Sequence, residues 1–347
     1  MSPYVLTMLS MSLLLGTTMT LISNHWLVAW IGLEINTLAI IPLMTKPHHP
    51  RSTEAAIKYF MTQATASMII LFSVIFNASI TNQWVTGQIF NKWASMLLTM
   101  ALAMKLGLAP FHFWVPEVTQ GIPLLSGMLM LTWQKIAPIS IIYQTSSSLS
   151  IPLLMLLGII STLLGGWGGL NQTQLRKILA YSSIAHMGWM AIIITIYPTL
   201  TILNLILYLA STITMFIMLN QLSLTKMNSL STLWNKSAPM MTIITLTLLS
   251  LGGLPPLTGF MPKWLILQEL IKFDNTPLAT VLALSALLNL FFYMRIIYSS
   301  ALTMFPSTNN SKLQWALTPL KTTPLISTLT IISSLLLPMT PMFITLL

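Results

Sequence analysis

Cysteine is absent from this sequence, and charge is scarce. A chain without cysteine cannot form a disulfide, hold an iron–sulfur cluster through thiolates or use a thiol as a nucleophile. Only 6% of the 347 residues are charged and five are acidic, which leaves too little polar surface to cover a soluble globule of this size. We therefore expect a protein that is not soluble, and we expect any redox chemistry connected with it to lie on another chain.

Apolar residues make up more than half of the sequence. They account for 55% of the sequence, with a mean hydropathy of +0.83, and they occur in runs of ~20 residues without apolar–polar alternation. A transmembrane barrel would alternate, so the runs predict helices. The first run, from Pro3 to Ile22, has the length of a permanent span and follows no charged leader, so no cleavable secretory or transit signal is expected.

The runs predict an all-α integral membrane protein with about eleven transmembrane helices. The expected spans are 3–22, 26–44, 55–80, 93–114, 122–144, 151–170, 178–197, 200–219, 240–271, 277–298 and 324–347. The fourth span should be broken, because Gly107 and Pro110 interrupt it, and the ninth should be broken near 252–259. Such backbone is tolerated in a membrane only where protein buries it or where it lines a wet cavity.

The two expected breaks share a sequence pattern. Gly107, Leu108, Pro110 and Pro116 recur 146 positions later as Gly253, Leu254, Pro256 and Pro262. Because five crossings separate the breaks, they should run in opposite directions through the bilayer. We therefore expect a single antiporter-like domain with a first five-helix repeat over 1–145, a second inverted repeat over 146–298, and a loop with a terminal helix over 299–347. Inverted repeats with paired discontinuous helices are typical of ion-coupled transporters.

Basic residues predict the orientation. Ten lie in or beside the loops on one side and two on the other, which places the N-terminus on the cytoplasmic or matrix side and the C-terminus across the membrane. The ten are Lys46, Arg51, Lys58, Arg176, Lys177, Lys226, Lys236, Arg295, Lys312 and Lys321; the two are Lys92 and Lys272. The net charge of +10 does not indicate a nucleic-acid partner, since it is spread singly over loops.

Three lysines and one glutamate fall inside spans. Glu34 lies near the centre of the second span, Lys105 and Lys135 are at similar depth in the fourth and fifth, and Lys263 follows the second break. A charge at that depth costs ~3 kcal/mol or more unless it is paired, so Glu34 and Lys105 are expected partners. Together the four residues could form a proton relay. The alternative is a static ion pair, although one carboxylate cannot pair three lysines.

Two histidines are further relay candidates. His112, after the first break, could pass protons to Lys105 or could simply hydrogen-bond backbone carbonyls that the break frees. His186 shares a helix face with Ser182 and Ser183, where a file of water or ordinary interhelical hydrogen bonds could form. Lys58, four residues after Glu54, predicts a surface ion pair instead.

No metal site is expected. His48 and His49 have no carboxylate or cysteine at ligand spacing. The 25 methionines are spread over all spans without a clustered thioether motif, so they indicate apolar filling and not copper binding.

Several of these motifs together carry a resemblance. They are Glu54–Phe60, Lys105–Glu117, Gln134-Lys135, Tyr181–Gly188 and Leu251–Lys263, in this order. The set closely resembles the subunit 2 family of NADH:ubiquinone oxidoreductase, respiratory complex I, in its mitochondrially encoded animal form. The resemblance implies an antiporter-like subunit of the membrane arm. It also implies a role for each buried charge. Glu34 would be the family's glutamate and Lys105 its partner, Lys135 would be the central relay lysine, and Lys263 would be the outlet lysine.

The resemblance also implies a setting. The subunit would lie in the mitochondrial inner membrane, with its N-terminus on the matrix side and its C-terminus on the intermembrane-space side. Its partners would be other membrane-arm subunits, including neighbouring antiporter-like ones, and phospholipid. NAD, FMN, iron–sulfur clusters and ubiquinone would be held by other subunits, with no cofactor on this chain. Bacterial relatives have fourteen helices, and the animal form is similar to this sequence in lacking the first three.

Two rival functions remain open at this stage. A self-contained sodium/proton antiporter would need carboxylates to hold a hard cation, and Glu34 is the only acid at mid-depth. A membrane scaffold with structural lysines would lose assembly, and not coupling alone, when those lysines are replaced.

Overall fold

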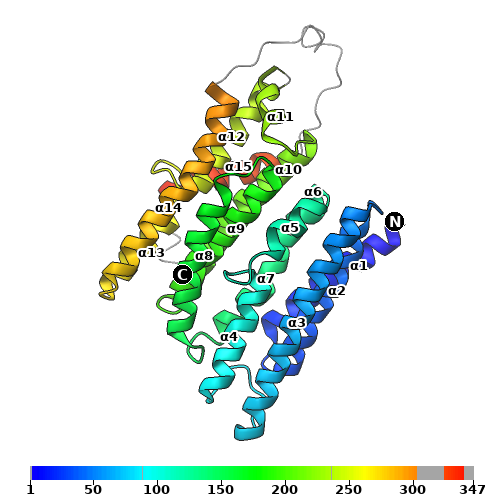
Figure 1. The fold of residues 1–347 in the computed structure, drawn as a ribbon, viewed down its shortest axis with the longest axis vertical. Coiled ribbons are helices and arrows are strands. Elements are labelled where there is room, and N and C mark those ends of the chain that lie inside the picture. The colour runs from blue at the N-terminus through cyan, green and yellow to red at the C-terminus, as the bar shows by residue number, and fades with distance from the viewer. Residues whose placement is uncertain (1, 88, 236, 303–323, 340–347) are drawn as a thin grey trace.

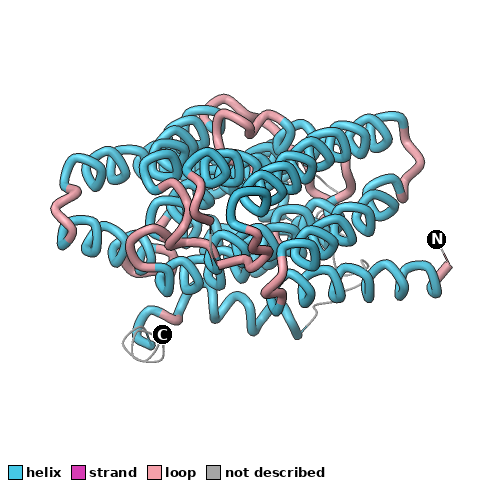
Figure 2. The backbone as a smooth tube through the Cα atoms, turned by 90° about the horizontal axis from the view of Figure 1, so that it is seen from below, coloured by secondary structure: helices cyan, strands magenta, loops and turns pink. Residues whose placement is uncertain are grey.

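The chain folds into one elongated bundle of helices. The computed structural model describes residues 2–87, 89–235, 237–302 and 324–339. Over these residues it contains helices, two isolated β-bridges and no named strand. Figure 1 shows the bundle advancing from α1–α3 at one side to α12–α14 at the other, and Figure 2 shows the helices joined by short loops.

The helices match most of the expected spans. The first half contains α1 (Pro3–Ile22), α2 (Trp26–Thr45), α3 (Pro50–Thr81), α4 (Lys92–Leu106), α5 (Trp114–Gly121), α6 (Leu124–Leu131) and α7 (Trp133–Gln144). The second half contains α8 (Ile151–Gly169), α9 (Leu175–Ile193), α10 (Pro198–Gln221), α11 (Met227–Ser231), α12 (Ala238–Gly252), α13 (Phe260–Lys272), α14 (Thr276–Ile297) and α15 (Pro324–Leu335). Short 3₁₀ or π turns follow α11, α14 and α15.

Seven described segments are long and apolar enough to cross a membrane. They are Pro3–Ile22, Trp26–Thr45, Pro50–Thr81, Leu124–Gln144, Ile151–Gly169, Pro198–Gln221 and Thr276–Ala301. The other four expected spans are the two broken ones, α9 and the terminal helix. The expected span 324–347 is described as far as residue 339, and its last residues lie outside the described part, as do Lys236, Lys312 and Lys321. The all-helical membrane class is therefore confirmed at this coarser level.

Both expected breaks are present, and the helix before each one ends with the same local geometry. Gly107 ends α4 at φ 73° and Gly253 ends α12 at φ 78°, a left-handed conformation that glycine adopts without a steric penalty. The amide of Leu108 bonds the carbonyl of Ala103, and the amide of Leu254 bonds that of Leu249 in the same way. Each break is thus a helix end closed by a Schellman motif.

A third interruption divides the fifth expected span, which the apolar run 122–144 predicts to be continuous. Thr132, at φ −111° and ψ −74°, separates α6 from α7. The carbonyl of Leu131, at the end of α6, accepts a hydrogen bond of 3.0 Å from the hydroxyl of Tyr208 on α10. A neighbouring helix therefore satisfies a backbone group that the interruption leaves free.

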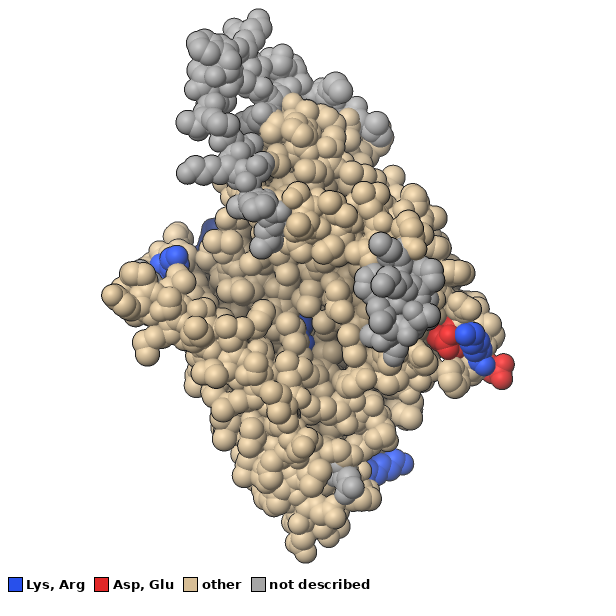
Figure 3. Space-filling model, turned by 180° about the vertical axis from the view of Figure 1, so that it is seen from behind, with Lys and Arg blue, Asp and Glu red and all other residues tan. Residues whose placement is uncertain are grey.

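The outer surface is apolar and the charge is confined to few places. Figure 3 shows one face on which charged residues are sparse, and large side chains such as Met8, Phe72 and Leu284 are exposed. In an aqueous protein this surface would be a liability, but in a bilayer it is lipid-compatible. Helix α3, 32 residues or ~48 Å long, exceeds a ~30 Å hydrocarbon core, so one of its ends extends beyond it.

Candidate functional site

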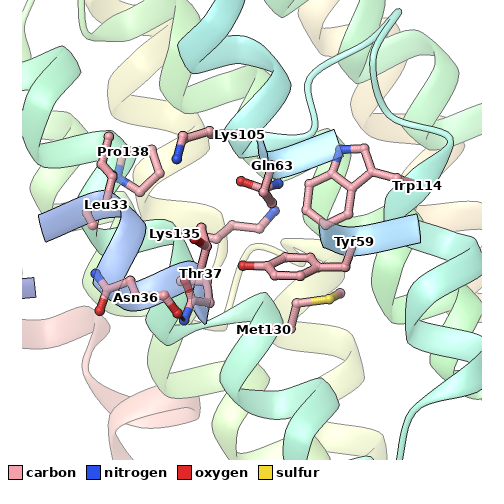
Figure 4. Close-up of a pocket in the computed structure, with 12 residues that line it drawn as sticks. Leu33, Asn36, Thr37, Tyr59, Gln63, Lys105, Trp114, Met130, Lys135 and Pro138 are labelled. Atoms are coloured by element: carbon pink, nitrogen blue, oxygen red, sulfur yellow. Dashed lines mark hydrogen bonds between the residues drawn. The ribbon is translucent and has the colours of Figure 1, made fainter. Parts of the chain in front are cut away.

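A small polar cavity lies in the first half of the bundle, among α2, α3, α4 and α7. Its volume is about 20 Å³, enough for about one water molecule. Its walls include Thr37, Tyr59, Gln63, Lys105, Gln134 and Lys135. In Figure 4 the side chain of Lys135 extends towards Gln63, and Lys105 enters from another helix. Two of the three expected lysines therefore share one site.

Lys135 is held by a helix end. It is the third residue of α7, directly after the interruption at Thr132, and is buried. Its Nζ donates to the carbonyl of Leu106 at 3.4 Å and contacts Ser183 Oγ on α9 at 3.3 Å. Leu106 is the last residue of α4, and the last four carbonyls of a helix lack intrahelical partners. The ammonium thus lies at the negative end of the α4 dipole.

Lys105 is buried without a hydrogen-bond partner. Neither its Nζ nor Nε2 of Gln63 has one, and both residues line the cavity. Buried donors in proteins are almost always satisfied, by protein or by ordered water. The first cavity therefore contains unsatisfied donors beside a space of water size.

Glu34 does not form the expected ion pair with Lys105. In the described part of the chain the ion pairs are Lys58–Glu54 and Lys58–Glu117, both 2.8 Å, and Lys272–Glu269, 2.6 Å. The half-buried Glu34 instead accepts a hydrogen bond of 3.1 Å from Thr37 and interacts electrostatically with Lys105 and Tyr59 at longer range. The prediction of direct contact is wrong in this conformation, because Glu34 lies beside the cavity and not in its wall.

The Lys58–Glu54 surface pair is confirmed. Lys58 also forms an ion pair with Glu117, which connects α3 to α5, the second half of the first broken helix.

Lys263 occupies a second cavity, also of about 20 Å³. Its Nζ donates a hydrogen bond of 2.9 Å to the carbonyl of Gly252, the last residue of α12. The acceptors Leu106 and Gly252 occupy equivalent positions in the repeated pattern. Their donors do not, because Lys135 lies 29 residues after Leu106 and Lys263 lies 11 residues after Gly252. The other polar walls of this cavity are His186, Trp189, Asn204, Tyr208, Ser211, Ser250, Thr258 and Ser333.

Helix α9 connects the two cavities. Ser183 contacts Lys135 beside the first, and His186, three residues on and so on the same face, lines the second. The ring of His186 lies 5.3 Å from that of Tyr208, which also lines the second cavity. Of the two histidine candidates, His186 is the one that the structure brings to a lysine cavity.

His112 lies apart from both cavities. It is buried in the first break, with its ring 4.3 Å from that of Phe113, and it is absent from the walls of either cavity. His49 has a local role, since its Nδ1 accepts from the amide of Arg51 and caps α3.

Sequence reasoning missed several polar residues of the two cavities, among them Tyr59, Gln63, Asn204 and Thr258. A usable signal exists for Gln63 and Asn204, because a side-chain amide in the middle of a long apolar helix needs a partner inside the bundle. Thr258 gives no such signal, since hydroxyls are common in these spans.

The sequence matches two family descriptions. Residues 23–289 match "NADH:quinone oxidoreductase/Mrp antiporter, TM", and residues 290–344 match "NADH dehydrogenase subunit 2 C-terminus". The chain belongs to the NADH-ubiquinone oxidoreductase chain 2 family. This confirms the resemblance that the sequence motifs indicate.

Similar proteins support the assignment over the full length. The chain is 84% identical to NADH-ubiquinone oxidoreductase chain 2 of Didelphis virginiana and 83% identical to that of Metachirus nudicaudatus, in each case over 100% of both chains. A chain in a structure of respiratory complex I from Thermus thermophilus with bound aureothin superposes with a TM-score of 0.81 at 27% identity. That match covers 93% of this chain and 75% of the bacterial one.

Proposed function

We propose that this chain is a membrane-arm subunit of respiratory complex I that carries protons along Glu34, Lys105, Lys135 and Lys263. Its family membership supports the setting. The relay itself is supported by one observation: two polar cavities in an apolar bundle each place a lysine amine at the carbonyl end of an interrupted helix. Helix α9 links them through Ser183 and His186.

The step that this geometry favours is a change at a helix end. A lysine held by main-chain carbonyls keeps its proton while the carbonyls point at it, and it releases the proton more readily when the half-helix turns away. A movement of α4 or α12 would therefore change proton affinity at Lys135 or Lys263. Bringing Glu34 closer to Lys105 would favour the protonated amine, so Lys105 would take up a proton. Separating the two would favour release of that proton towards Lys135. Moving one elementary charge across the membrane against a potential of 100 mV costs ~2.3 kcal/mol, which the helix movement would have to supply.

The surroundings of the relay follow from the family. Electron transfer from NADH to ubiquinone, with its FMN and iron–sulfur clusters, would take place on other subunits, and this chain would hold no cofactor. The half-exposed Glu34 would be covered by a neighbouring membrane-arm subunit, since a bare carboxylate at mid-membrane is costly. Phospholipid would cover the remaining apolar surface, and no nucleic acid is involved.

The finer architecture is part of the same proposal. We place the protein in the mitochondrial inner membrane as eleven spans, in inverted repeats over 1–145 and 146–298, with a loop and terminal helix over 299–347. The matching Schellman ends at Gly107 and Gly253 support the repeat. The N-terminus would face the matrix and the C-terminus the intermembrane space, as the basic loops indicate.

The test is the number of protons translocated per NADH oxidised, in proteoliposomes of the assembled complex. Lys263→Gln should assemble but pump fewer protons or turn over more slowly when coupled. Lys272→Gln is the matched control, because Lys272 lies on the same helix and is 57% exposed. Native stoichiometry and rate in assembled Lys263→Gln would contradict the relay, and loss of assembly in every relay variant would favour a scaffold. A saturable sodium flux through the protein in liposomes would favour the antiporter.

A further inference from the structure

The last described helix ends at the second cavity. Helix α15 has 12 residues and is ~18 Å long. It packs against α10 and α12, beside which it is drawn in Figure 1. Ser333, in its last turn, is buried and forms part of the wall around Lys263. The terminal helix therefore contributes to the lysine site.

One hydrogen bond connects this helix end to the second break. The carbonyl of Ser333 is among the last four of α15, which have no partner within the helix. It accepts a hydrogen bond from the hydroxyl of Thr258, in the loop between α12 and α13. The carbonyl of Thr258 in turn accepts from the amide of Met261 at 3.2 Å, in the first turn of the helix that carries Lys263. Thr258 thus contacts α15 through its side chain and α13 through its backbone.

The charge of the second cavity is compensated by backbone. No carboxylate is present among the described residues that line it. The last turns of two helices reach it, that of α12 with Gly252 and that of α15 with Ser333, and a helix C-terminus carries about half a negative charge. The position of α15 therefore affects the environment of the Lys263 ammonium as well as the wall of the cavity.

We propose that Thr258 is a positioning residue, whose hydroxyl fastens the end of α15 to the second break and so holds Lys263 at the carbonyl of Gly252 in the second cavity. This inference rests on the proposed relay role of Lys263. It gives the terminal helix a function, which is to contribute Ser333 to the wall of the cavity around Lys263.

The test compares Thr258→Val, which keeps the shape and removes the hydroxyl, with Thr258→Ser, which keeps the donor. Both are measured in the assembled complex, by assembly on native gels, by coupled NADH:ubiquinone turnover and by its pH profile. We expect Thr258→Val to assemble and to lose about 2- to 10-fold in coupled turnover, the range that one lost hydrogen bond gives, with a displaced pH profile. Thr258→Ser should restore both rate and profile.

Three outcomes would overturn the proposal. Thr258→Val could keep the native rate and pH profile, or Thr258→Ser could be as impaired as Thr258→Val. If Thr258→Val does not assemble, Thr258→Cys serves as the second variant, since its thiol is a weak donor of similar size. If Thr258→Val and Thr258→Cys both fail to assemble while Thr258→Ser assembles, the hydroxyl is needed for folding and not for positioning. Lys263→Gln is measured in parallel: native pumping in that variant rejects the relay, whereas impaired Lys263→Gln beside native Thr258→Val rejects the positioning role alone.

Discussion

The amine of Lys263 donates its hydrogen bond to the carbonyl of Gly252, at 2.9 Å, with no acidic side chain among the described residues of the cavity wall. The main chain therefore takes the place of a counter-ion. Lys135 and Leu106 repeat the relationship at the first break with a longer contact of 3.4 Å. A lysine held in this way is sensitive to the orientation of the helix that supplies the carbonyl.

Gly253→Ala should displace Lys263. The left-handed backbone at φ 78° costs any residue with a Cβ about 1 kcal/mol, and a Cβ here would lie 2.8 Å from Lys263 Nζ. We expect lower thermal stability of the subunit within the complex together with reduced coupled turnover. Gly87→Ala is the control, since a Cβ at that position meets nothing within 4 Å. Equal behaviour of the two variants would contradict the account of the second break.

Ser183→Ala should weaken the link between the cavities. The change removes the oxygen 3.3 Å from Lys135 Nζ and leaves the ammonium with one distant carbonyl. Loss of a hydrogen bond to a charged group costs ~1.5–3 kcal/mol, so the rate of proton pumping should fall about tenfold or more. Pumping is compared with that of Ser140→Ala, whose hydroxyl bonds only within its own helix. If both variants pump alike, Ser183 is a packing residue.

Tyr208→Phe should loosen the interruption between α6 and α7. The carbonyl of Leu131 would lose its 3.0 Å donor and remain buried, at a cost of ~1–3 kcal/mol. A lower unfolding temperature of the membrane arm is expected. Tyr143→Phe should leave that temperature unchanged, because Tyr143 is 37% exposed. An unchanged unfolding temperature in Tyr208→Phe would show that Leu131 finds another donor.

The breaks were predictable because glycine and proline act locally. Gly107 and Gly253 are each followed within three residues by proline, a combination that favours a helix end. Hydropathy places the long helices to within a few residues at most ends. The interruption at Thr132 was not predictable, since its neighbours are good helix formers. It is supported by the hydroxyl of Tyr208, which is 77 positions away in the sequence.

The site was only partly predictable for a similar reason. Charge in an apolar span identifies Lys105, Lys135 and Lys263, and all three are buried beside polar cavities. Depth along a helix says nothing of the direction of a side chain around it, which is why Glu34 and Lys105 were expected to touch and do not. Contacts made by main-chain carbonyls have no residue signature at all.

That last property affects how variation in this protein should be interpreted. Leu106, a buried core residue, and Gly252, which has no side chain, present the same main-chain acceptor, so the contact with lysine does not depend on side-chain identity. At Gly252 an added Cβ would meet only the Tyr293 side chain, at 3.6 Å, so Gly252→Ala should leave the acceptor in place. A substitution elsewhere in α4 or α12 that changes the direction of the helix end would instead move the carbonyl away from Lys135 or Lys263.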